Sequence, residues 1–173
     1  VKKTDSKEYY CKAEKYLKIC LQRAIRLERI NYSEYLTYVS NAHHNLGFLY
    51  GSHDYNKALS HYREALSLRR KLFEATQNPR YERDIAETLV NTCWVYIYVI
   101  SDAMKDKPSG AISLPENPVS IASEALCIHK KYLTKGVLGL ETNYYTALLL
   151  NGYLNLLLSY TSIPANSEYG MKC

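Results

Sequence analysis

Two landmarks recur in step along this chain, and their repetition limits what it can fold into. The first is a small residue inside a helix-like segment, at Cys20, Ala65 and Ala125. The second is an asparagine that follows each small residue after 25 or 26 positions, at Asn45, Asn91 and Asn151. Recurrence on this scale is typical of stacked supersecondary units, in which each unit buries its apolar face against the next one.

The segments between the landmarks carry helix signals. Apolar residues recur every three or four positions over 35–49, which is the period of an α-helix. Asn31, Asp54, Asn78 and Asn117 stand where a side chain would cap the start of a helix, and Pro follows the last two of them. With only 7 Gly and 5 Pro in 173 residues, we expect long uninterrupted helices.

The expected fold is therefore all-α. About six helices are predicted, at residues 6–29, 33–52, 55–75, 80–105, 119–135 and 141–160. The second landmark spacing is longer than the first, 60 residues (65 to 125) against 45 (20 to 65), because a loop insertion rich in Pro, Ser and Gly lies at 105–117. Gly136 is expected to end the fifth helix, and residues 164–173 read as a tail.

The middle of the chain resembles a known repeat family. Its landmarks there are Asn45-Leu46-Gly47 with Tyr50, then Asp54-Tyr55, Ala58, Tyr62 and Ala65-Leu66, and together they are similar to one complete tetratricopeptide repeat. In that family small residues stand where two helices cross closely, and larger residues fill the space between them. The resemblance implies a right-handed α-solenoid in one domain, residues 1–163: a half repeat at 6–29, a full repeat at 33–75, a degenerate repeat at 80–135 and a half repeat at 141–160.

The repeat length points to two subgroups of the family. Extended repeats of 45 residues (20 to 65) resemble those of the kinesin light chain. They also resemble bacterial arrays of such repeats that flank protease-like or nucleotide-binding domains in signalling proteins. The resemblance thus implies a scaffold module that binds a protein or peptide, or alternatively a regulatory segment that packs against a catalytic domain of the same parent chain.

The resemblance also implies where a partner would bind. In these arrays the first helix of each unit lines a concave face, and the matching positions here are Asn41, His44, Asn45, Phe48, Glu87, Asn91, Trp94, Asn151 and Leu154. An amide both donates and accepts hydrogen bonds, so the asparagines could hold an extended peptide backbone. Alternatively, they hydrogen-bond between neighbouring helices and set the helix spacing. Glu87 and Ala147 stand where a carboxylate clamp would have cations, so capture of a C-terminal carboxylate is not expected.

Patterns for catalysis or metal binding are missing from the sequence. His43 and His44 are adjacent and point to different helix faces, and the other three histidines, at 53, 61 and 129, have no partner at ligand spacing. The sequence contains no phosphate loop, nucleophile elbow or HExxH motif. We therefore expect a protein that is not an enzyme, with no catalytic residue, metal site or cofactor.

Cysteine usage and charge bear on compartment and partners. The five Cys include no CxxC pair, so free thiols in a reducing, cytoplasmic setting are expected, with Cys20 and Cys93 buried and inert. The net charge of +5 is scattered, which does not indicate nucleic-acid binding. The apolar stretch at 147–158 is too short to cross a bilayer, so no membrane association is expected. The start at Val1 and the unpaired half repeats suggest a piece of a longer protein that could self-associate through its open ends.

Overall fold

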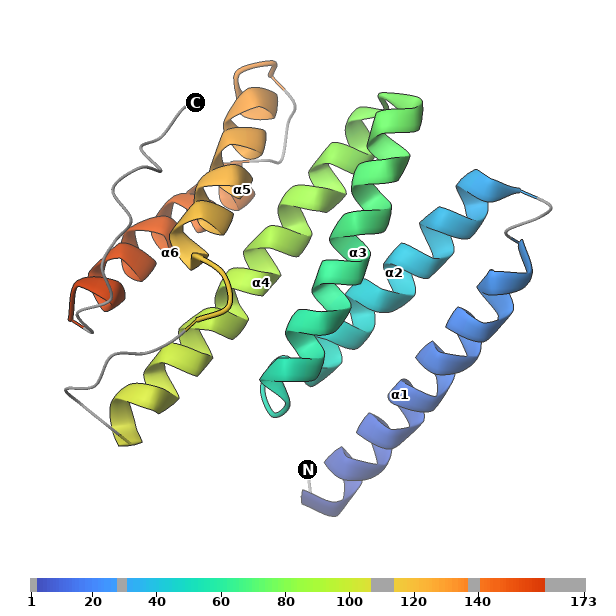
Figure 1. The fold of residues 1–173 in the computed structure, drawn as a ribbon, viewed down its shortest axis with the longest axis horizontal. Helices are drawn as coiled ribbons and strands as arrows, with labels where there is room; N and C mark the ends of the chain where they lie inside the picture. Colours follow the sequence, from blue (N-terminus) through green and yellow to red (C-terminus); the bar gives the residue numbers. More distant parts are fainter. Residues whose placement is uncertain (1–2, 28–30, 107–113, 137–140, 161–173) are drawn as a thin grey trace. The chain divides into compact units, whose positions relative to one another are not determined.

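The computed structural model describes residues 3–27, 31–106, 114–136 and 141–160, and most of these residues are helical. Those residues form six α-helices and one short 3-10 helix, Ile25–Leu27, and contain no strand (Figure 1). The α-helices are α1 (Lys3–Ala24), α2 (Tyr32–Tyr50), α3 (Tyr55–Thr76), α4 (Pro79–Asp106), α5 (Pro118–Leu133) and α6 (Glu141–Tyr160). The all-α class and the positions of the helices are confirmed, whereas the expected tail at 164–173 and most of the insertion at 105–117 lie outside the described residues.

The predicted helix starts are confirmed by their side-chain hydrogen bonds. Asn31 Oδ1 accepts from the backbone N–H of Glu34 at 3.2 Å, and Asp54 Oδ1 accepts from that of Lys57 at 3.1 Å. Asn117 caps α5 in the same way, with Pro118 as its first residue. Each cap satisfies a backbone donor that has no partner inside the helix, and so fixes where the helix begins.

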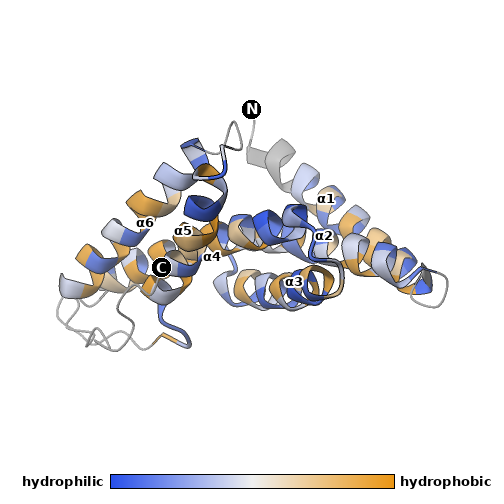
Figure 2. Ribbon diagram, turned by 90° about the horizontal axis from the view of Figure 1, so that it is seen from above, coloured by the Kyte–Doolittle hydropathy of each residue, from blue (hydrophilic) through white to orange (hydrophobic). Residues whose placement is uncertain are grey.

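Two compact units divide the chain, Val1–Asp84 and Ile85–Cys173. The first holds α1, α2, α3 and the first residues of α4, and the second holds the rest of α4 with α5 and α6. Hydrophobic and hydrophilic residues alternate along the helices of both units (Figure 2). This amphipathic pattern lets each helix bury one face against its neighbours. The single continuous solenoid stays a prediction.

In the first unit α2 packs against both α1 and α3. Its seam with α3 is tight: Gly47, Ala58 and Ala65 are buried there, and the Tyr62 ring is 1% exposed. A Cβ atom built on Gly47 would lie 2.7 Å from two carbons of the Tyr62 ring. Gly47 therefore stands where α2 approaches a buried ring of α3, whereas for Ala58 and Ala65 the structure shows burial alone.

In the second unit α4, α5 and α6 share one apolar core. Its buried members are Cys93, Ile97, Ile100, Ala122, Leu150, Leu154, Leu157 and Leu158. A polar contact also joins α6 to α5, because Asn151 Nδ2 donates to Ser123 Oγ at 2.8 Å. The core is completed by half-buried apolar side chains from α4 and α5 and by Leu114.

The cysteines depart from expectation in two places. Cys93 is buried and free as predicted, and burial raises its pKa to about 12, which keeps the thiol protonated. Cys20 is exposed, so the prediction that it replaces a buried packing residue is wrong. Cys127 is disulfide-bonded, so the prediction of a free thiol is wrong there.

None of the helices in the described part of the chain combines the length and the apolar character that a bilayer span requires.

Replacing Gly47 by Ala tests the close approach of α2 and α3. The new methyl group would meet the buried Tyr62 ring, and we expect a loss of about 1–3 kcal/mol in the free energy of unfolding. Gly152 provides the matched control, because it also lies inside a helix but a Cβ there meets nothing within 4 Å. Gly152→Ala should instead gain up to about 1 kcal/mol from helix propensity. Urea unfolding measures the stability of both variants. An equal gain in the free energy of unfolding for Gly47→Ala and Gly152→Ala would contradict the close packing of Gly47 on Tyr62.

Stability should fall in acid partly through His129. This imidazole is 2% exposed and burial lowers its pKa, so the folded unit binds its proton less readily than the unfolded chain. The stabilising effect is present above the unfolded pKa of about 6.5 and is lost as the pH falls below it. When the pH is lowered from about 7.5 to about 5.5, the free energy of unfolding should fall less for His129→Leu than for the unsubstituted chain. The control His53→Gln, at an exposed site, should lose as much as the unsubstituted chain. Parallel pH profiles for His129→Leu and the parent would show that His129 does not contribute.

Candidate binding groove

A groove of about 650 Å³ lies between α1 and α2 in the first unit. From α1 it is lined by Leu17, Cys20, Arg23 and Ala24, and from α2 by Glu34, Tyr38, Asn41, Ala42 and Asn45. The α2 side is a stripe at three- and four-residue steps, so its members share one helix face. Apolar side chains, amides and two opposite charges thus meet in a single concave site.

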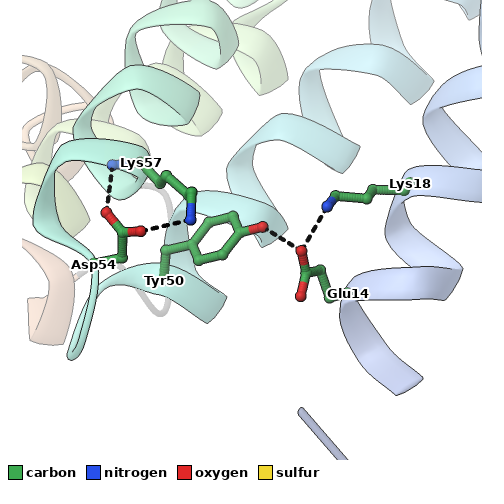
Figure 3. A network of polar contacts seen from close by, with 5 residues as sticks. All are labelled: Glu14, Lys18, Tyr50, Asp54 and Lys57. Carbon is green, nitrogen blue, oxygen red and sulfur yellow. Dashed lines mark hydrogen bonds and ion pairs between the residues drawn. The ribbon is translucent and has the colours of Figure 1, made fainter. Parts of the chain in front are cut away.

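The α1 wall of the groove is held to α2 by a polar contact. Tyr50 Oη donates to Glu14 Oε1 at 2.6 Å, and Lys18 Nζ reaches the same oxygen at 2.5 Å (Figure 3). The hydrogen bond from Lys18, followed by that from Tyr50, lowers the pKa of Glu14, so the carboxylate is charged at neutral pH. Burial and the Glu14 contact raise the pKa of Tyr50 to about 12, which keeps its hydroxyl a donor.

The same tyrosine links this contact to the start of α3. Lys57 Nζ lies 5.3 Å from the centre of the Tyr50 ring and 2.7 Å from Asp54 Oδ2, which belongs to the residue that caps α3 (Figure 3). The cap of α3 and a cation–π contact therefore lie next to the point where α1 is attached. Tyr50, itself in α2, contacts α1 through its hydroxyl and α3 through its ring.

Behind the α2 wall lies a buried arginine. Arg69 of α3 is 4% exposed, and its Nη1 donates to the Asp84 carbonyl at 2.6 Å and to His44 Nδ1 at 3.2 Å. Because a guanidinium only donates, His44 Nδ1 accepts and its own proton is on Nε2. Burial, and then the charge of Arg69, lower the pKa of His44 to about 4, so the imidazole is neutral at pH 7.

Arg69 also orients a side chain of the groove. Its Nη2 donates to Asn41 Oδ1 at 3.0 Å. A hydrogen bond from a charged donor fixes which end of a carboxamide is oxygen and which is nitrogen. The oxygen of Asn41 thus accepts from Arg69, which leaves the NH₂ group as the end of this carboxamide that can donate elsewhere.

Four predicted site residues lie on α2, and the structure brings three of them to the surface. Asn41 and Asn45 line the groove, and Phe48, one turn beyond Asn45, is 71% exposed. His44 is buried in the contact with Arg69 and does not line the groove.

The other five predicted site residues lie in the second unit. Glu87 is exposed, Asn91 is half-buried and Trp94 is 43% exposed, all on α4. The side-chain NH₂ group of Asn151 donates to α5. This contact agrees with the alternative in which the asparagines hydrogen-bond between neighbouring helices and set their spacing. Leu154 is fully buried in the core of that unit.

Several groove residues are missing from the sequence-based prediction. Tyr38 could have been found, because it precedes Asn41 by three residues on the same face of α2. Leu17, Cys20 and Arg23 could not, because only the packing of α1 on α2 brings them opposite this face. His61 has no partner at ligand spacing along the sequence, but packing of α2 on α3 brings its Nδ1 to 3.0 Å from Nδ1 of His43.

Comparisons of the chain with protein-family models, with curated proteins and with solved structures find no match.

Removing the buried guanidinium should destabilise the first unit. Arg69→Met leaves the Asp84 carbonyl, His44 Nδ1 and Asn41 Oδ1 without their donor, and we expect a loss of about 3 kcal/mol in unfolding free energy. Lys71→Met is the control, because Lys71 is exposed on the same helix and should change stability by no more than about 0.5 kcal/mol. Chemical denaturation measures both variants, and similar midpoints for the two would contradict a structural role for Arg69.

Proposed function

We propose that the chain is a non-enzymatic scaffold module that binds an extended segment of a protein in the groove between α1 and α2. The observation that carries this proposal is the orientation of Asn41. Its oxygen accepts from Arg69, so its NH₂ group is a donor held in place at the wall of the groove. A preorganised donor suits a backbone carbonyl, which every peptide offers whatever its sequence.

The second amide of the groove extends this recognition. Asn45 is exposed one turn beyond Asn41 on the same face of α2. Its amide offers both a donor and an acceptor to an adjacent peptide group. Two amides at consecutive turns of a helix would pair with an extended backbone along its length.

The floor of the groove favours apolar side chains of the bound segment. Leu17, Ala24 and Ala42 supply aliphatic surface, and the Tyr38 ring, which is 55% exposed, supplies an aromatic edge. A volume of about 650 Å³ is within the range of sites that enclose a few side chains rather than a whole domain. The small alanines leave space that a ligand side chain would fill.

Charges at the groove would set the direction of the segment. Arg23 on α1 and Glu34 at the start of α2 have opposite signs, and both are exposed. Exposed charges contribute little affinity but steer and orient a partner. The resemblance to tetratricopeptide repeats supports the same face, because α2 corresponds to the first helix of the complete repeat, the helix whose concave side binds peptides in that family.

Selection of ligands from a displayed library of random 12-residue peptides, followed by a blocking experiment, tests this function. A bulky maleimide on Cys20 should fill the groove and reduce binding of a selected peptide by about tenfold or more. Asn45→Ala should also weaken binding, since it removes an exposed amide of the groove without opening the core.

Cys11 supplies the matched control for the blocking experiment. It is a free, exposed thiol on the same helix but does not line the groove. Labelling the Cys20→Ser chain at Cys11 should leave the affinity for the peptide unchanged, while labelling the Cys11→Ser chain at Cys20 should reduce it by about tenfold or more. Equal effects of the two labels, or peptides that bind irrespective of Cys20 and Asn45, would place the binding surface elsewhere.

A further inference from the structure

Two histidines from different helices face each other across the seam between α2 and α3. Nδ1 of His43 and Nδ1 of His61 are 3.0 Å apart, and the ring centres are 5.1 Å apart with a tilt of 49°. Both side chains are half-buried, so the pair is fixed by packing and still reached by water. Tyr50 stacks on His61 with its ring centre at 5.6 Å and its plane inclined by 6°, which holds that imidazole in place.

Both imidazoles are available as neutral ligands. Burial lowers the pKa of His43 and of His61, so neither ring is protonated at both nitrogens at neutral pH. At this separation one ring nitrogen donates its proton to the other. If that proton is displaced, both nitrogens can bind the same metal cation.

The separation of the two nitrogens fits a shared metal ion. Imidazole nitrogen binds Zn²⁺ at about 2.0–2.1 Å, so two such ligands at angles of about 90° to about 109° have their nitrogens about 2.8–3.4 Å apart. The observed 3.0 Å lies inside that interval. Small rotations about the terminal side-chain bond, where the energy well is broad, would turn both lone pairs toward a common point.

We propose that His43 and His61 form a two-nitrogen binding site for one divalent transition-metal ion of the Zn²⁺, Ni²⁺ or Cu²⁺ class. The ion bridges α2 and α3 and so clamps the seam of the first unit. Imidazole is a preferred ligand of these borderline ions and a poor one for Mg²⁺ or Ca²⁺.

The remaining coordination positions belong to water. Among the described residues no group of three or more His, Cys, Asp or Glu side chains is placed to hold a metal ion, so the protein supplies two ligands here. Glu64 favours a cation at this place, because its charge acts on both imidazoles from one turn beyond His61. Lys18 opposes it, but this ammonium is paired with Glu14 at 2.5 Å.

The other histidines are engaged differently. His44 accepts from the buried Arg69, His53 contacts Ser52 Oγ at 3.1 Å, and His129 is buried. The pair at 43 and 61 is therefore the place in the described chain where two imidazole nitrogens converge.

Titration of the untagged chain with Ni²⁺ alone tests the site. Ni²⁺ is the better probe because cysteine sulfur, which Cys11 and Cys20 expose, selects Zn²⁺ and Cu(I) instead. Calorimetry should detect one Ni²⁺ per chain, and the thermal midpoint should rise with Ni²⁺ by about 3–5 °C for each tenfold excess over the dissociation constant. His43→Gln and His61→Gln should each weaken binding by about tenfold or more, because one imidazole remains.

His53→Gln is the matched control, since it removes an exposed histidine of the same unit and should leave Ni²⁺ binding unchanged. Selective paramagnetic broadening of the His43 and His61 ring protons in the unsubstituted chain needs no variant and keeps the test valid if a substitution impairs folding. Absence of binding at about 1 mM Ni²⁺, or equal loss in the His53 and His61 variants, would overturn the proposal.

Discussion

The close approach of α2 to α3 at Gly47 and Tyr62 is the constraint on which the first unit depends. A Cβ atom at Gly47 would lie 2.7 Å from the Tyr62 ring, so only a glycine lets the ring occupy this place. The same ring makes an edge contact with His44 at 5.7 Å. Because the helices are this close, residues on the preceding turn of α2 meet α3 directly, which places His43 against His61 and His44 against Arg69.

The close packing of α2 on α3 buries the guanidinium of Arg69, and Arg69 in turn orients Asn41 at the groove. A guanidinium removed from water is costly unless its donors are satisfied, and Arg69 uses a carbonyl, an imidazole and a carboxamide as acceptors. The carboxamide belongs to Asn41, so a packing requirement on one side of α2 fixes a donor on the other side. The proposed binding surface is thus coupled to the core by a single side chain, and it needs no loop to position its amide.

Much of the fold could be predicted because helix signals are local. A cap such as Asn31 or Asp54 acts within three residues of itself, and the apolar period of α2 is legible along the chain. The helix positions agree with expectation for this reason. The candidate site was predicted only on its α2 side, where Asn41, Asn45 and Phe48 share a face. The α1 side depends on how a second helix packs on α2, which no local pattern encodes.

The recurring asparagines differ in what the sequence and the tertiary structure each determine about them. The sequence by itself determined that Asn45 and Asn151 lie in helices and follow a small residue, Cys20 or Ala125, at nearly the same spacing. Only the tertiary structure decided what each contacts: Asn45 is exposed in a groove that α1 completes, whereas the amide of Asn151 donates a hydrogen bond to Ser123 of α5. The physical reason is that an amide takes whichever partner its neighbours present, and those neighbours come from other helices. The spacing of residues along the chain indicates where the helices form. Only the packing of those helices decides which polar side chains keep a donor or acceptor for a partner.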